Sequence, residues 1–342
     1  MVILNILRTF FNKRDDGVWQ IFSMCSVDLN PEVEGQTGFY KVHNSLIHSQ
    51  PDINGPMSAI LGRSIVPIVA RDIESGFLRA IGTGFFISCS GLLLTAAHVV
   101  IDPIERSYGA VKEVEEKIYV SEELELGIML PLNPFNEGEG FLFVKIEWAA
   151  FMADKTESPL PFAGVDLKLQ IDLAICKVTE LNSKFPFQPL ALVQPGLKGV
   201  GMQVDKQAYA LGYGNMNDVA FENGEATTDL NFDLHVSKGK ITRRFPNNSK
   251  DKSASTPGPC FQTDGIYPGG MSGSPIFDEE GVYVHGVVSK GVEGENGPEP
   301  LGFGSMIYPA LNVPIKGRNG KTLLELMEDG EDGMTKVSMP NA

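Results

Sequence analysis

Three segments of the sequence carry side chains that could together perform nucleophilic catalysis. Ser272 lies in GGMSGSP, His98 in TAAHVV and Asp172 in IDLAICKV. A serine hydroxyl is a poor nucleophile at neutral pH, so it needs a base that takes its proton and a carboxylate that orients this base. It also needs main-chain N–H donors directed at the oxyanion that forms when it attacks a carbonyl. The sequence offers one candidate for each of these groups.

The glycines around Ser272 predict a tight turn whose N–H groups converge on one point. We expect the N–H groups of Gly270 and Ser272 to be the oxyanion donors. An ordinary Gly/Ser turn is the alternative for this heptapeptide taken alone. The elbow pattern G-x-S-x-G is not present, because Ser274 stands where its last glycine would be.

The setting of His98 and Asp172 separates them from similar residues. Small residues precede only His98 among the five histidines, whereas a lone histidine such as His285 is more often a strand or core residue. Asp172 opens an apolar strand, where a carboxylate is costly to bury unless a partner such as a histidine N–H satisfies it. Asp102 and Asp166 are weaker candidates, because neither leads directly into such a strand.

The elements that must position these residues are mostly short strands. The chain contains 37 Gly and 22 Pro, and runs rich in Val, Ile and Phe alternate with turns in two blocks, about 60–183 and 190–315. Closed barrels are one way to protect the edges of so many strands, although composition does not distinguish a barrel from a sandwich. The run TLLELMED predicts a short helix near the end, and helical spacing of apolar residues predicts another over residues 3–11.

Composition limits the partners and the setting of the protein. A net charge of −15 argues against nucleic acid or an anionic membrane as the main partner. No apolar run approaches the roughly 20 residues of a membrane span. Arg8 interrupts the first apolar stretch, which excludes a typical secretory signal. The four widely spaced cysteines are typical of reduced thiols, so we expect a cytoplasmic protein.

Together, the three segments resemble the chymotrypsin-like, or trypsin-like, serine peptidases of the bacterial type. TAAHVV is similar to the family's histidine motif, DLAICKV to its aspartate motif and GGMSGSP to its serine motif, and they follow in the family's order. GTGFFIS is similar to the strand that precedes the histidine in bacterial members. The resemblance covers roughly residues 60–315.

The resemblance implies an all-β fold of two six-stranded antiparallel barrels. The implied parts are an N-terminal extension (1–59), a first barrel with His98 and Asp172 (60–185), a second barrel with Ser272 (186–315), and a C-terminal helix and tail (316–342).

The activity that the resemblance implies is that of a serine endopeptidase working through an acyl-enzyme. Ser272 would attack the scissile carbonyl, His98 would act as general base and then as general acid, and Asp172 would hold the ring in the right tautomer. The N–H groups of Gly270 and Ser272 would stabilise the oxyanion. The resemblance implies no metal and no organic cofactor.

The run VHGVVSKG resembles the strand along which the substrate main chain pairs. The implied substrate-binding residues are Ser289, Lys290 and Gly291 on this strand, with Ile266, Gly291 and Gly302 around the primary pocket. Ile266 at the pocket base predicts a preference for apolar or aromatic residues before the cut. A shifted loop register would instead bring Asp264 into the pocket and favour Arg or Lys.

The sequence departs from the family pattern at several places, and two alternatives to a constitutively active peptidase also stay open. Met271 stands where many secreted members carry the aspartate that captures a new N-terminus, so that activation route is not expected. Lys290 stands where the family often has an aromatic residue. The alternatives are a protease-like module that binds peptides without cutting them, and a latent peptidase that a partner activates by ordering its loops. A regulatory partner would dock on residues 1–59 or 101–165.

Overall fold

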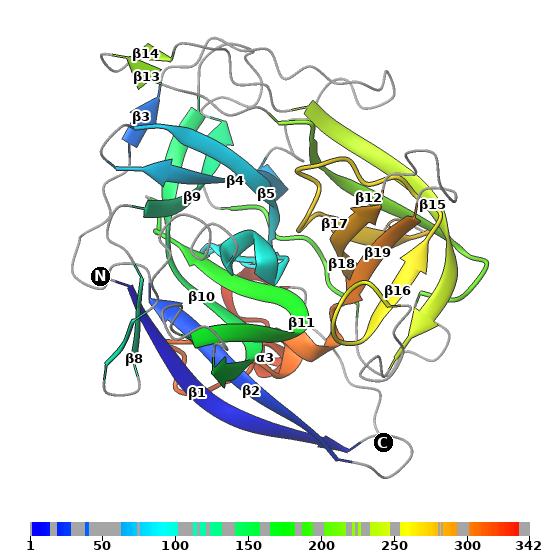
Figure 1. The fold of residues 1–342 in the computed structure, drawn as a ribbon. Helices are drawn as coiled ribbons and strands as arrows, with labels where there is room; N and C mark the ends of the chain where they lie inside the picture. The colour runs from blue at the N-terminus through cyan, green and yellow to red at the C-terminus, as the bar shows by residue number, and fades with distance from the viewer. Residues whose placement is uncertain are drawn as a thin grey trace.

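The computed structural model describes most of both predicted strand-rich blocks (Figure 1). The described residues are 2–13, 19–28, 38–40, 63–73, 76–101, 112–114, 117–120, 124–131, 141–157, 165–181, 187–193, 202–216, 221–222, 225–226, 233–246, 254–279, 281, 283–292 and 301–334. Antiparallel strands dominate this part of the chain. Within it, no helix has the length and apolar character needed to cross a membrane.

Six strands of the first block close into a barrel. They run in the order β11-β6-β5-β4-β9-β10, and β10 pairs again with β11. Their interior is filled by apolar side chains that are almost fully buried, such as Phe85, Leu94 and Phe143. The strands are β4 (Ile65–Asp72), β5 (Leu78–Phe86), β6 (Leu92–Thr95), β9 (Leu124–Pro131), β10 (Phe141–Glu157) and β11 (Val165–Val178).

Six strands of the second block form another closed barrel, in the order β12-β15-β16-β19-β18-β17. The all-β fold of two six-stranded antiparallel barrels is therefore confirmed. The barrels are packed together: Tyr213 at the end of β12 is buried, and its hydroxyl donates to the carbonyl of Ile65 in β4 at 3.3 Å. The strands are β12 (Gln207–Gly214), β15 (Asp233–Phe245), β16 (Cys260–Thr263), β17 (Pro275–Asp278), β18 (Val284–Val292) and β19 (Leu301–Met306).

The short C-terminal helix is also confirmed, as α3 (Leu323–Asp329). Thr322 and Glu325 form a reciprocal capping box at its start, and Gly330 ends it in the left-handed conformation with φ 67°. Leu323, together with Leu326 and Met327, is buried in the hydrophobic core that includes the first barrel. The chain thus returns from the second barrel to the first.

The N-terminal helix predicted over residues 3–11 is wrong. These residues lie in β1 (Val2–Lys13), which pairs with β2 (Trp19–Asp28), and β2 in turn pairs with β10. A short apolar run suits either a helix or a strand, and here the pairing of β1 with β2, which is itself joined to the sheet through β10, decides. The other strands are β3 (Gly38–Tyr40), β7 (Lys112–Val114), β8 (Lys117–Val120), β13 (Phe221–Glu222) and β14 (Glu225–Ala226).

Candidate active site

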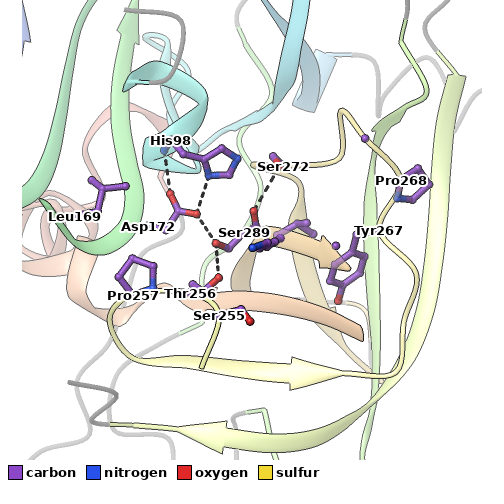
Figure 2. Close-up of a pocket in the computed structure, with 14 residues that line it drawn as sticks. His98, Leu169, Asp172, Ser255, Thr256, Pro257, Tyr267, Pro268, Ser272 and Ser289 are labelled. Carbon is purple, nitrogen blue, oxygen red and sulfur yellow. Dashed lines mark hydrogen bonds and ion pairs between the residues drawn. The ribbon is translucent and has the colours of Figure 1, made fainter. Parts of the chain in front are cut away.

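The three candidate residues come from both barrels and line one pocket (Figure 2). His98 lies in a helical turn at residues 97–101 that follows β6, and Asp172 lies on β11, which pairs with β6. Ser272 lies in the turn between β16 and β17 of the second barrel. The pocket has a volume of about 580 Å³ and runs from Leu169 to Tyr267.

Both oxygens of the Asp172 carboxylate bind His98. The distance from Asp172 Oδ2 to His98 Nδ1 is 2.8 Å, and the main-chain N–H of His98 donates to Asp172 Oδ1 over 2.9 Å. These two contacts hold the ring and its main chain against the same carboxylate. Nδ1 therefore carries a proton when Asp172 is ionised, and Nε2, on the opposite edge of the ring, is left to act as an acceptor.

Two hydroxyls of the second barrel complete the surroundings of Asp172. The Ser289 hydroxyl donates a short hydrogen bond to Asp172 Oδ2, and the oxygens of Ser289 and Thr256 are 2.8 Å apart. Because the Ser289 proton points to the carboxylate, the Thr256 hydroxyl is the donor in the second contact. Asp172, Ser289 and Thr256 are all buried.

These contacts keep Asp172 ionised despite its burial. Burial alone raises the pKa of Asp172, but the neighbouring His98 and the hydrogen bonds from His98 and Ser289 outweigh this effect and lower the pKa below its ordinary value. The carboxylate is therefore negatively charged at neutral pH. It can orient the His98 ring and stabilise the imidazolium form.

The turn around Ser272 depends on glycines, as predicted. Gly270 and Gly273 have φ values of 93° and 91°, in the region that favours glycine. A Cβ atom on Gly273 would lie 1.9 Å from the carbonyl oxygen of Thr83. Only glycine therefore fits at position 273 without a shift of the main chain.

The geometry of this turn leaves two N–H groups available. Asn215 donates its main-chain N–H to the Gly269 carbonyl at 2.7 Å. The C=O and N–H of a trans peptide point in opposite directions, so the N–H of Gly270 points away from Asn215. Among the described residues, neither the Gly270 N–H nor the Ser272 N–H has a hydrogen-bond acceptor.

The Ser272 hydroxyl does not bind His98 in this structure. Its hydrogen bond goes to the main-chain carbonyl of Ser289 on β18, over a long 3.5 Å (Figure 2). Proton transfer to His98 would require the hydroxyl to turn towards the ring.

The structure brings only some of the expected substrate-binding residues to the pocket. Ser289, Lys290 and Gly291 line it, but Ile266 and Gly302 do not. Ile266 is 55% exposed outside the pocket. Asp264 does not line the pocket either, because its Oδ1 accepts the main-chain N–H of Lys240 at 2.6 Å.

Tyr267, the neighbour of Ile266, is the residue that lines the pocket. Its ring packs directly on Gly302, where an added Cβ would lie 2.4 Å from Tyr267 Cε2. Burial raises the pKa of Tyr267 to about 12, so the phenol is neutral. Tyr267 lies only five residues before Ser272, so the serine motif could have indicated it. Thr256 has no such signal, because it lies 33 residues from Ser289 in the sequence.

One comparison with known proteins identifies a family. A family model described as a trypsin-like peptidase domain matches residues 82–287. A search of curated protein sequences found no match.

Solved structures with low sequence identity also match. Two are inactive forms of the Rv3671c protease, one of them a serine-to-alanine variant from M. tuberculosis H37Rv. The variant is 18% identical over 77% of this chain and 91% of its own, with a TM-score of 0.37. The other form is 19% identical over 77% and 93%, with a TM-score of 0.36. A third structure, Deg5, is 17% identical over 77% and 94%, with a TM-score of 0.42. The family model matches more than half of the chain, and the chain therefore belongs to the trypsin-like peptidase domain family.

Proposed function

We propose that this protein is a serine endopeptidase in which Ser272 is the nucleophile, His98 the general base and acid, and Asp172 the group that orients His98. The observation that carries the proposal is the paired contact of His98 with Asp172 in the pocket that Ser272 also lines. Ser272 Oγ would attack the substrate carbonyl while His98 Nε2 takes its proton, and His98 would then protonate the leaving amine. Water would hydrolyse the acyl-enzyme in the second half of the reaction.

The available N–H groups of Gly270 and Ser272 support an oxyanion hole in this mechanism. They come from one glycine-rich turn, and the hydrogen bond from Asn215 to Gly269 directs the first of them. Donors that are already oriented stabilise the developing negative charge without reorganisation at the moment of reaction.

The test is labelling of the purified protein with a serine-reactive fluorophosphonate probe. Ser272→Ala and His98→Ala are run beside the wild type, with unfolding curves that show all three proteins are folded. We expect the wild type alone to be labelled. Labelling that persists in Ser272→Ala would refute the assignment of the nucleophile.

We propose that the residue before the cut is small and apolar. The neutral ring of Tyr267 lies against Gly302, and Gly291 faces the Tyr267 carbonyl oxygen, 2.2 Å from where a Cβ on Gly291 would lie. Because the ring fills the space beside Gly302, we expect it to compete with an aromatic substrate side chain there, contrary to the preference expected from Ile266. The substrate main chain would pair with Ser289, Lys290 and Gly291 as an added strand.

A latent peptidase is the second candidate function, and the orientation of the Ser272 hydroxyl favours it. This hydroxyl is bonded to the Ser289 carbonyl, on the strand that would pair with substrate. A substrate N–H that donated to the Ser289 carbonyl would displace the Ser272 hydroxyl, which could then turn towards His98. A folded wild type that is labelled only after a peptide or partner is added would support latency. A folded wild type that binds peptides and is never labelled would indicate a non-cleaving module. Docking of a regulatory partner on residues 1–59 or 101–165 stays a prediction.

A further inference from the structure

Thr83 connects the first barrel to the turn that carries Ser272. It lies on β5, is completely buried and does not line the pocket. Its main-chain N–H donates to the carbonyl of Ser272 at 2.8 Å, and its own carbonyl accepts the hydroxyl of Thr95 at 2.7 Å. The main chain of Thr83 is thus held on one side by its own barrel and binds the nucleophile residue on the other.

The side chain of Thr83 makes a separate contact with the same turn. Its hydroxyl accepts the main-chain N–H of Tyr213 at 3.0 Å and lies 3.0 Å from the Gly270 carbonyl. The hydroxyl has one proton to donate, and the other carbonyl within reach, that of Tyr213, is farther away at 3.4 Å. The proton therefore goes to Gly270.

This contact matters because of where Gly270 lies. A glycine at φ 93° has few steric limits on rotation, so its neighbours must determine where its N–H points. The peptide before Gly270 is held by Asn215, which donates to the Gly269 carbonyl. The peptide after Gly270 is held at both of its ends: Thr83 donates to the Gly270 carbonyl, and the Met271 N–H donates to the Pro268 carbonyl at 3.1 Å. Together, these contacts hold both peptide planes that meet at Gly270, and the Thr83 hydroxyl is the only one of them that comes from the first barrel.

We propose that the Thr83 hydroxyl is a positioning group for the oxyanion hole, which acts by holding the Gly270 carbonyl so that the Gly270 N–H stays directed at the substrate. The inference rests on the proposed peptidase function. Thr83 touches neither substrate nor the reacting atoms, so loss of its hydroxyl affects the transition state more than substrate binding.

The test compares Thr83→Val, which keeps the shape and loses the hydroxyl, with Thr83→Ser, which keeps the hydroxyl. Loss of a whole oxyanion donor lowers kcat by about 10²–10³-fold. In Thr83→Val the Gly270 N–H is retained but less well directed, so kcat should fall about 10- to 100-fold, with KM nearly unchanged. Thr83→Ser should recover most of this loss.

A matched control is Thr179→Val. Like Thr83→Val, it removes a threonine hydroxyl that donates to a main-chain carbonyl, but this carbonyl is that of Lys145 in the first barrel, away from the pocket. Unfolding curves establish that each variant is folded, and Thr83→Ala replaces Thr83→Val if the latter does not fold. A second readout is the affinity for a peptide aldehyde, whose carbonyl adds the serine hydroxyl to form a hemiacetal with its oxygen in the hole. This affinity should fall, whereas affinity for the uncleaved product peptide should not.

The possible results separate the inference from the function on which it rests. An active wild type with Thr83→Val as active as Thr179→Val would overturn the inference alone. So would a rise in KM at constant kcat, or a Thr83→Ser variant as impaired as Thr83→Val. A wild type that is never labelled by fluorophosphonate and cleaves no peptide would overturn the peptidase function, and the inference with it.

Discussion

The packing of the Tyr267 ring in the pocket predicts which peptides the protein cuts. Tyr267 lines the pocket, and its ring packs on Gly302, where an added Cβ would lie 2.4 Å from Tyr267 Cε2. We expect the wild type to prefer Ala or Val before the cut over Phe. Tyr267→Ala removes the ring and should open this space to a large apolar side chain.

The size of the expected change follows from burial. Moving a Phe side chain from water into an apolar site contributes about 1.5–3 kcal/mol. If this energy is realised in the transition state, the ratio of kcat/KM for a Phe substrate to that for an Ala substrate should rise about 10- to 150-fold in Tyr267→Ala.

The assay uses a series of peptides that differ only in the residue before the cut: Ala, Val, Leu and Phe. Tyr267→Phe is the control, because it keeps the ring and loses only the contact of the hydroxyl with Thr263 at 3.1 Å. Unfolding curves accompany the kinetics, since Tyr267 is part of the second barrel's core and truncation of a buried aromatic residue costs about 3–5 kcal/mol. A wild type that cuts after Phe as fast as after Ala, or an unchanged profile in folded Tyr267→Ala, would refute the argument.

Three further predictions concern the triad and its turn. Thr256→Val removes the hydroxyl that donates to Ser289, so steady-state kinetics should show kcat lowered about two- to tenfold, with recovery in Thr256→Ser; equal kcat in all three proteins would contradict this. The pKa of Asp172 is lower in the folded state than in the unfolded state, so ionised Asp172 stabilises the fold fully at neutral pH. This stabilisation is lost as the pH falls below the pKa of the unfolded state and through that of the folded state. The difference in urea unfolding free energy between wild type and Asp172→Asn should therefore shrink on acidification. A constant difference would show that the ionisation of Asp172 does not stabilise the fold. Gly273→Ala would place Cβ against the Thr83 carbonyl at positive φ, so thermal unfolding should show a loss of about 1–3 kcal/mol or more; an unchanged midpoint would mean that the turn relaxes freely.

Much of the fold could be predicted from local patterns. β-branched and aromatic runs between turns indicated the strands of both barrels, because such side chains suit a pleated and half-buried surface. The capping box of Thr322 and Glu325 encodes the start of α3 within four residues. The helix expected over residues 3–11 is wrong because a short apolar run is compatible with either structure. Its pairing with β2, which pairs in turn with the distant β10, makes it a strand.

The primary pocket could be predicted only in part. The serine motif indicated which segment forms its wall. Within this segment, however, Ile266 is 55% exposed and its neighbour Tyr267 is buried. Adjacent residues of an extended segment point to opposite sides, so an error of one residue exchanges them.

The sequence by itself indicated which residues are the candidates for catalysis. His98, Asp172, Ser272 and the glycines beside the serine are recognisable because each lies in a short motif whose residue types the chemistry requires. Only the tertiary structure decided which groups hold them. Thr83 lies 187 residues from Gly270 in the sequence, and Ser289 lies 117 residues from Asp172. Such contacts give no periodic pattern in the sequence, because they form only when the two barrels pack against each other.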